Sequence, residues 1–241
     1  MPMRPEQGQD PRRDFLIRAL ASGLIAAGAL LPGGRNAAAQ ILGRRPKQMP
    51  AGQSVYDLTG PVMVNGKLIK RGASISPTDR VETGKGAQAI FVVGADAFIL
   101  RENSRLELGG SGALVNTLRL ATGALLSVFG RGTKQVYGVT ATIGVRGTGL
   151  YVESDPDQTY VCTCYGEVDI TASDDPSVSE RIVSTHHDSP RYVLRAGAGR
   201  RIRPAPFKNH TDLELMLIES LVGRKPPFSL FDESYGSPRR Y

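Results

Sequence analysis

Short apolar runs, each ended by a glycine or a turn, are the feature that most limits how this chain can fold. From Ser54 to about Arg203 the runs are rich in Val, Ile, Leu and Thr, and Gly, Asn-Gly or Pro interrupts them roughly every ten residues. Asn65-Gly66 lies between two such runs, and both residues accept the positive φ of a type I′ turn, so we expect a tight hairpin there. The sequence therefore predicts an all-β domain.

The spacing of the expected strands does not fix how they assemble. A compact solenoid-like β-domain, a barrel-like β-domain and a sandwich all fit short strands with glycine at the corners. We expect strands at residues 62–64, 68–70, 89–93, 97–100, 106–108, 114–120, 124–128, 136–143, 150–153, 160–164, 168–171 and 192–195.

One α-helix is expected near the C-terminus, within residues 207–228. Thr211 can cap it, because Glu214 lies three residues further on and can reach back to the Thr211 amide. Gly223 is a typical residue for the end of such a helix. We expect the helix to cover strand edges of the β-domain, and docking onto a partner is the alternative. Its expected apolar face consists of Leu213, Met216, Leu217 and Leu221.

The first 39 residues have the features of an export signal. Arg12-Arg13 precedes a short apolar stretch, and Ala37-Ala38-Ala39 offers the small residues that a signal peptidase requires. The arginine pair, followed by Asp-Phe-Leu, resembles the twin-arginine export motif. The apolar stretch is shorter than the roughly 20 residues of a membrane-spanning helix. We therefore expect cleavage near Ala39, a mature protein in the periplasm and no transmembrane anchor.

Removal of residues 1–39 from the 241-residue chain would leave 202 residues and lower the formal net charge from +7 to +5. A chain of this length can form one domain with its own core. The excess charge is scattered, and outside the cytoplasm a nucleic-acid partner is not expected. Residues 40–53 lack apolar periodicity and are expected to be a flexible lead-in, and residues 229–241 a disordered tail.

One stretch carries a resemblance to a known family. Residues 139–148, which read VTATIGVRGT and are followed by Leu-Tyr-Val, are similar to the signature of the FecR domain, and residues 54–171 fall where that family has its successive strands. The resemblance implies a compact, right-handed, solenoid-like β-domain in the periplasm. Beyond Thr171 the chain departs from the family pattern, and we expect a polar loop and additional strands at 172–206. Well-known members carry a cytoplasmic anti-sigma segment and a transmembrane helix. We find neither in this sequence, so sigma-factor control is not expected, and the resemblance transfers no catalytic residue.

The centre of this signature is Gly144, Val145, Arg146, Gly147 and Thr148. Two glycines within a strand indicate a corner of the backbone or a close approach to another strand. We expect the Arg146 guanidinium to donate to carbonyl groups left unpaired at that corner. Binding of an anion by Arg146 is the alternative.

All cysteine and histidine residues of the chain lie within one stretch of 49 residues, from position 162 to position 210. Cys162 and Cys164 are two positions apart on an expected strand, so their side chains leave the same face and could share one ion as thiolates. The histidines lie at the ends of expected elements, where they could converge on that face. Two thiolates with one or two imidazoles suit zinc or copper. The candidate ligands are Cys162, Cys164, His186, His187 and His210.

Two other interpretations of the cysteines stay open. A disulfide is the usual state of two cysteines in an exported protein. On a flat strand, however, residues two apart stand about 6.5 Å apart with parallel Cβ vectors, which does not favour a bond. Ordinary buried or redox-sensitive thiols are the third interpretation.

No sequence motif of an enzyme is present, whether G-x-S-x-G, H-E-x-x-H or a phosphate-binding loop. The favoured hypothesis is therefore a non-enzymatic binding or signalling module for a periplasmic or envelope protein or polymer. The rival hypothesis is a metal-binding protein that uses the Cys/His group.

Overall fold

The computed structural model describes residues 47–50, 53–197 and 199–228. The expected export signal, the expected C-terminal tail and most of the expected lead-in lie outside these ranges. Within them the chain forms a large sheet of 14 strands and one short C-terminal helix, which confirms the predicted all-β fold with a C-terminal helix. Within the described ranges, no helix combines the length and the hydrophobicity of a membrane-spanning segment.

The strands follow one another with short connections. Their bounds are β1 (Val55–Thr59), β2 (Val62–Val64), β3 (Lys67–Leu68), β4 (Arg80–Thr83), β5 (Gln88–Val93), β6 (Asp96–Leu100), β7 (Arg105–Ser111), β8 (Leu114–Val128), β9 (Thr133–Tyr137), β10 (Ala141–Ser154), β11 (Gln158–Ala172), β12 (Asp175–Ser184), β13 (Arg191–Leu194) and β14 (Ile202–Pro204), and the helix is α3 (Asp212–Leu221).

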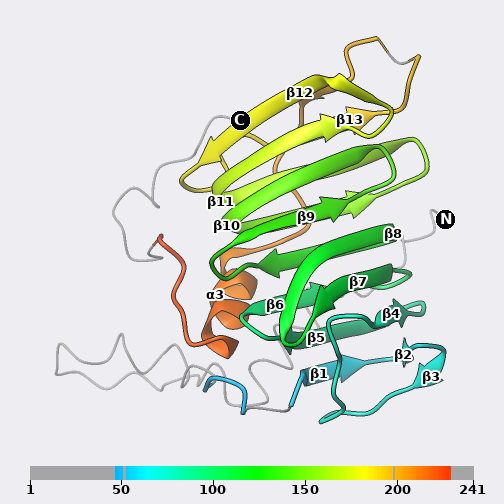
Figure 1. Ribbon diagram of the computed structural model, residues 1–241, viewed down its shortest axis with the longest axis vertical. Coiled ribbons are helices and arrows are strands. Elements are labelled where there is room, and N and C mark those ends of the chain that lie inside the picture. Colours follow the sequence, from blue (N-terminus) through cyan, green and yellow to red (C-terminus); the bar gives the residue numbers. More distant parts are fainter. Residues whose placement is uncertain (1–46, 51–52, 198, 229–241) are drawn as a thin grey trace, which may run out of the picture. The chain divides into compact units, whose positions relative to one another are not determined.

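The strands stack in nearly the order of the sequence, as Figure 1 shows from β2 and β3 at one end to β12 and β13 at the other. The main path runs β14-β13-β11-β10-β9-β8-β7-β4-β2-β3, and β1, β5, β6 and β12 pair beside it. All pairings are antiparallel except β8 with β9. The sheet does not close on itself, so the barrel-like alternative is wrong. Stacking in sequence order agrees with the solenoid-like alternative.

The hairpin of β2 and β3 is built as the sequence predicted. Asn65 and Gly66 have φ angles of 51° and 77°, the positive values that a type I′ turn requires at both positions. Met63 pairs with Leu68 across the hairpin. Both side chains are exposed, so this hairpin adds little to the core.

The main core lies on the inner face of the sheet. Along β11, Val161, Val168 and Ile170 belong to it, and Val152 and Ile143 contribute from β10. Since alternate residues of a strand face opposite sides, the direct neighbours of these core residues, such as Cys162 and Asp169, face outward.

A second buried layer covers part of the outer face. Five residues on five adjacent strands are cross-strand neighbours and therefore share that face. The helix α3 lies against β6 and β8 (Figure 1). The expectation that the helix covers strand edges is therefore wrong. The helix instead covers part of a sheet face, where the five cross-strand neighbours form an apolar row that it shields from water. The row consists of Ile90, Ile99, Leu126, Tyr151 and Cys162.

The start of α3 follows the sequence prediction. The Glu214 amide donates to the Thr211 hydroxyl, and the Thr211 amide donates to the Glu214 carboxylate. The buried face, however, is rotated from the expected one. Leu215 and Ile218 are fully buried, whereas Leu213 and Met216 are only half-buried.

Candidate metal centre

The structure brings four of the five candidate ligands into one buried group. Cys162 and Cys164 come from β11, His187 from the turn between β12 and β13, and His210 from the segment just before α3. One ligand atom of each lies within 4.8 Å of the others. The four residues expose at most 4% of their surface, so the group is closed to solvent.

The shortest distances in the group join sulfur to nitrogen and nitrogen to nitrogen. Cys162 Sγ lies 3.4 Å from His187 Nδ1, and Cys164 Sγ lies 3.4 Å from His210 Nε2. The two nitrogens, His187 Nδ1 and His210 Nε2, are 3.1 Å apart. The four atoms therefore point toward a common centre.

The other nitrogen of each imidazole is fixed by an acceptor on the far side. His210 Nδ1 donates to the carbonyl oxygen of Lys208 at 2.7 Å, and because a carbonyl only accepts, this nitrogen carries the proton. His187 Nε2 donates to Asp212 Oδ1 at 3.0 Å. When both imidazoles are neutral, the two nitrogens that face each other therefore carry no proton, and each directs a lone pair at the other. A proton or a cation between them is required to stabilise this contact.

A β-bulge directs the Cys164 side chain. In the pairing of β10 with β11, the register shifts between Gly149 and Leu150, opposite Cys164. Gly149 is needed here because a Cβ at this position would lie 2.4 Å from the Tyr165 ring. The strand is thus not flat at Cys164, contrary to the assumption used against a disulfide. Both cysteines are nevertheless free.

His187 occupies an uncommon backbone conformation. Its φ of 55° lies in the left-handed region, which non-glycine residues adopt rarely and often at functional sites. Its amide donates to the Cys164 carbonyl at 3.0 Å, which ties the turn to β11. The Tyr151 ring stacks on His210 at 4.4 Å, and Phe207 packs against both imidazoles. Aromatic packing and one backbone hydrogen bond thus hold the imidazoles against the cysteines.

His186 is the candidate that does not join the group. Its Nε2 lies 2.8 Å from Asp212 Oδ1, the same oxygen that accepts from His187. Asp212 was not among the residues predicted from the sequence. An acidic residue in the first turn of a helix is expected from the helix dipole alone. The sequence therefore gave no sign that Asp212 contacts the histidines.

The electrostatics of the group favour a thiolate at Cys162. Burial alone would raise the pKa of Cys162, but hydrogen bonds with Cys164, His187 and His210 outweigh burial and hold it well below its usual value. Burial raises the pKa of Cys164 well above its usual value, and the neighbouring Cys162 adds to this rise. Burial lowers the pKa of His187, yet contacts with Asp212 and Cys162 raise it overall. The group can therefore hold a cation.

The signature stretch behaves differently from the prediction at Arg146. Gly147 has a φ of 60° and lies within the register shift between Arg146 and Gly149, which confirms an irregular backbone there. The Arg146 side chain is 59% exposed and lies 3.8 Å from Glu167 and 3.5 Å from Asp169. The expected donation to carbonyl groups is therefore wrong, since carboxylates on β11 attract the guanidinium outward.

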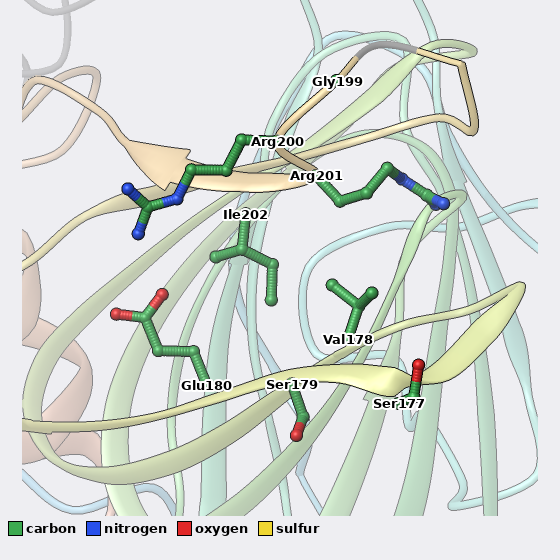
Figure 2. Close-up of a pocket in the computed structure, with 8 residues that line it drawn as sticks. All are labelled: Ser177, Val178, Ser179, Glu180, Gly199, Arg200, Arg201 and Ile202. Atoms are coloured by element: carbon green, nitrogen blue, oxygen red, sulfur yellow. The ribbon is translucent and has the colours of Figure 1, made fainter.

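A surface pocket of about 480 Å³ lies away from this group, between β12 and the segment that leads into β14 (Figure 2). Arg200 and Arg201 point away from each other across it. Glu180 is paired with Arg191 at 2.7 Å, and Arg201 with Asp174. No set of charged groups converges in this pocket, so the Cys/His group is the stronger candidate.

Comparisons with known proteins give distant structural likenesses alone. No family model and no curated protein matches the chain. Two crystal structures of a "putative anti-sigma factor" from Parabacteroides distasonis ATCC 8503, at 1.65 and 2.50 Å resolution, are similar in structure, with TM-scores of 0.42 and 0.43 and identities of 12% and 13%. Each match covers 52% of this chain and 58% of the other. At this level the likeness carries no argument about function, and membership of the FecR family stays a prediction.

Proposed function

We propose that this protein binds one zinc ion through Cys162, Cys164, His187 and His210, and that the ion stabilises the fold. The observation that supports this most strongly is the pair of facing nitrogens, 3.1 Å apart, whose protons are held on the far side by Asp212 and Lys208. Two thiol groups lie beside them at 3.4 Å. A divalent cation would satisfy all four donors at once.

The distances match those of tetrahedral zinc. With zinc–sulfur bonds of about 2.3 Å and zinc–nitrogen bonds of about 2.0 to 2.1 Å, a sulfur and a nitrogen stand about 3.5 Å apart and two nitrogens about 3.4 Å apart. The corresponding separations here are 3.4 Å and 3.1 Å. These three separations differ from the tetrahedral values by at most a few tenths of an ångström, and all four ligand atoms lie within 4.8 Å of one another.

The closed environment favours a stabilising role over a catalytic one. Catalytic zinc sites keep an open position for water, whereas stabilising sites use four protein ligands. Here four ligands, none more than 4% exposed, complete the coordination sphere. We infer that the protein is not an enzyme at this centre.

Zinc fits the donor set better than copper. Two thiolates with two imidazoles in a tetrahedron are typical of zinc, and copper(II) prefers a square arrangement. Copper(I) is the alternative, because it also accepts soft thiolates. Metal analysis of the purified protein distinguishes the two.

The proposal applies to an exported protein. In an oxidising compartment two neighbouring thiols tend to form a disulfide, and a bound ion would protect them.

Replacing both Arg12 and Arg13 by lysine is expected to stop export of the precursor. The measurement is the amount of mature protein in the periplasm. Normal amounts of mature protein there would contradict the twin-arginine route. An envelope partner stays a prediction of the sequence.

The direct test measures metal and thiols together in protein purified from the exported fraction. We expect about one zinc per chain and two reduced thiols, with zinc lost in the double variant Cys162→Ser, Cys164→Ser. His186→Ala is the matched control, since His186 is adjacent in sequence but outside the four-residue group. Wild-type protein without zinc or copper, or with Cys162 and Cys164 joined in a disulfide, would contradict the proposal.

A further inference from the structure

One carboxylate oxygen joins the proposed centre to the helix. Asp212 Oδ1 accepts from His187 Nε2 at 3.0 Å and lies 2.8 Å from His186 Nε2. Asp212 is the first residue of α3, and its side chain is only 8% exposed. No other carboxylate among the described residues is grouped with the imidazoles of the centre.

The start of the helix does not explain why this carboxylate is buried. Thr211 and Glu214 already form a reciprocal cap, and Glu214 also pairs with Arg101 at 2.8 Å. A buried carboxylate is costly unless charged or polar partners satisfy it. The partners of Asp212 are the two imidazoles, so its contacts concern the centre rather than the cap.

We propose that Asp212 is the positioning residue of the centre, and that it couples occupancy by the ion to the docking of α3. This inference rests on the proposed function. By accepting from Nε2, Asp212 holds His187 in the tautomer whose Nδ1 lone pair faces the cysteines. Such carboxylate–histidine–zinc arrangements orient the ligand and raise its basicity, and their loss weakens metal binding about 10-fold to 100-fold.

The coupling follows from the position of Asp212 in the chain. His210, a ligand, lies two residues before α3, and Asp212, bound to a second ligand, begins it. The helix can leave β6 and β8 only if it pulls on both ligands. Because linkage is reciprocal, an ion that binds only the docked arrangement must favour docking of the helix.

The experiment compares Asp212→Asn, Asp212→Ala and the control Glu214→Gln in the full chain. Zn²⁺ affinity is measured by competition with a chelator, and Co²⁺ is added as a spectroscopic probe of tetrahedral thiolate coordination. Asp212→Ala should weaken Zn²⁺ binding toward 100-fold and Asp212→Asn toward 10-fold, since asparagine keeps an acceptor oxygen. Glu214→Gln removes a buried carboxylate from the same helix start, outside the centre, and should leave the affinity within about twofold of wild type.

Hydrogen exchange of α3 tests the coupling itself. In wild type and in Glu214→Gln, Zn²⁺ should slow the exchange of the α3 amides. In Asp212→Ala at saturating Zn²⁺ this protection should be lost or strongly reduced. Equal affinity in Asp212→Ala and wild type would overturn the inference while leaving the zinc proposal intact. Failure of wild type to bind Zn²⁺ would overturn the proposed function instead. Binding of two ions per chain would overturn the positioning role, because Asp212 would then be a ligand of the second ion.

Discussion

From Thr159 to Tyr165 both faces of β11 are buried, but different interactions stabilise them. Val161 and Thr163 face the main core, which is formed almost entirely by apolar side chains. Cys162 and Cys164, at the intervening positions, face titratable groups under the C-terminal segment. The inner face can be satisfied by close packing alone, whereas the outer face needs a proton or an ion to balance its donors.

The outer face of β11 is not uniform either. Near the end of the strand, Glu167 and Asp169 are partly exposed and pair with Arg146 and Arg181. The Cys/His group lies where the C-terminal segment excludes water. Burial by that segment, rather than the strand itself, therefore makes these side chains a centre instead of a solvated surface.

Deletion of residues 211–222 should have the largest effect, because it uncovers the outer face. The helix buries four fully apolar side chains, each stabilising by roughly 1.5 to 3 kcal/mol, against a total stability of about 5 to 15 kcal/mol for a typical domain. We expect loss of cooperative melting or aggregation, measured by thermal unfolding and size-exclusion chromatography. These side chains are Leu215, Leu217, Ile218 and Leu221.

A single change on the half-buried side of the helix is the control for this deletion. Leu213→Ala should cost much less than Ile218→Ala, for which about 2 to 5 kcal/mol is expected. An unchanged melting curve for the deleted protein would show that the helix is a detachable docking element, and the two faces would then be stabilised independently.

Removal of the ion should have the next largest effect on the thermal stability of the protein. It should destabilise the outer face of β11 alone. If free Zn²⁺ exceeds its dissociation constant about 1,000-fold, binding stabilises the native state by about 4 kcal/mol. For a domain of this size that corresponds to a melting temperature higher by about 8 to 16 °C. Thermal melts with Zn²⁺ and with a chelator measure the difference. In the Cys162→Ser, Cys164→Ser variant the two melts should coincide, and a remaining zinc effect would place the ion elsewhere.

The sequence predicted the elements better than their assembly. The Asn65-Gly66 hairpin and the Thr211–Glu214 cap depend on residues close in sequence, and both formed as expected. The open sheet and the rotation of the helix face depend on long-range packing, which periodicity does not encode. Leu215 and Ile218 are buried because the outer face of the sheet meets that side of the helix.

The candidate site was predictable as a set of residue types but not as a geometry. Cysteine at alternate positions of a strand and clustered histidines identified the candidate ligands. Adjacent His186 and His187 could not be separated from sequence, because the left-handed φ of His187 decides which imidazole faces β11. The bulge at Cys164 and the role of Asp212 likewise appear only when distant segments meet.

The smallest effect on stability is expected from a substitution of Thr163, which lies between the two cysteines and faces the inner side of the sheet. Thr163 is 1% exposed, and its hydroxyl has no hydrogen-bond partner within the described part of the chain. A buried, unsatisfied hydroxyl costs about 1 to 3 kcal/mol, so Thr163→Val should raise the stability by about 1 kcal/mol and the melting temperature by about 2 to 4 °C. Zinc content should not change, because Thr163 faces away from the centre. Cys162→Val, one position away, should lower both stability and zinc content. If Thr163→Val instead loses zinc, the two faces of β11 are coupled through the strand, and the contrast drawn between them fails.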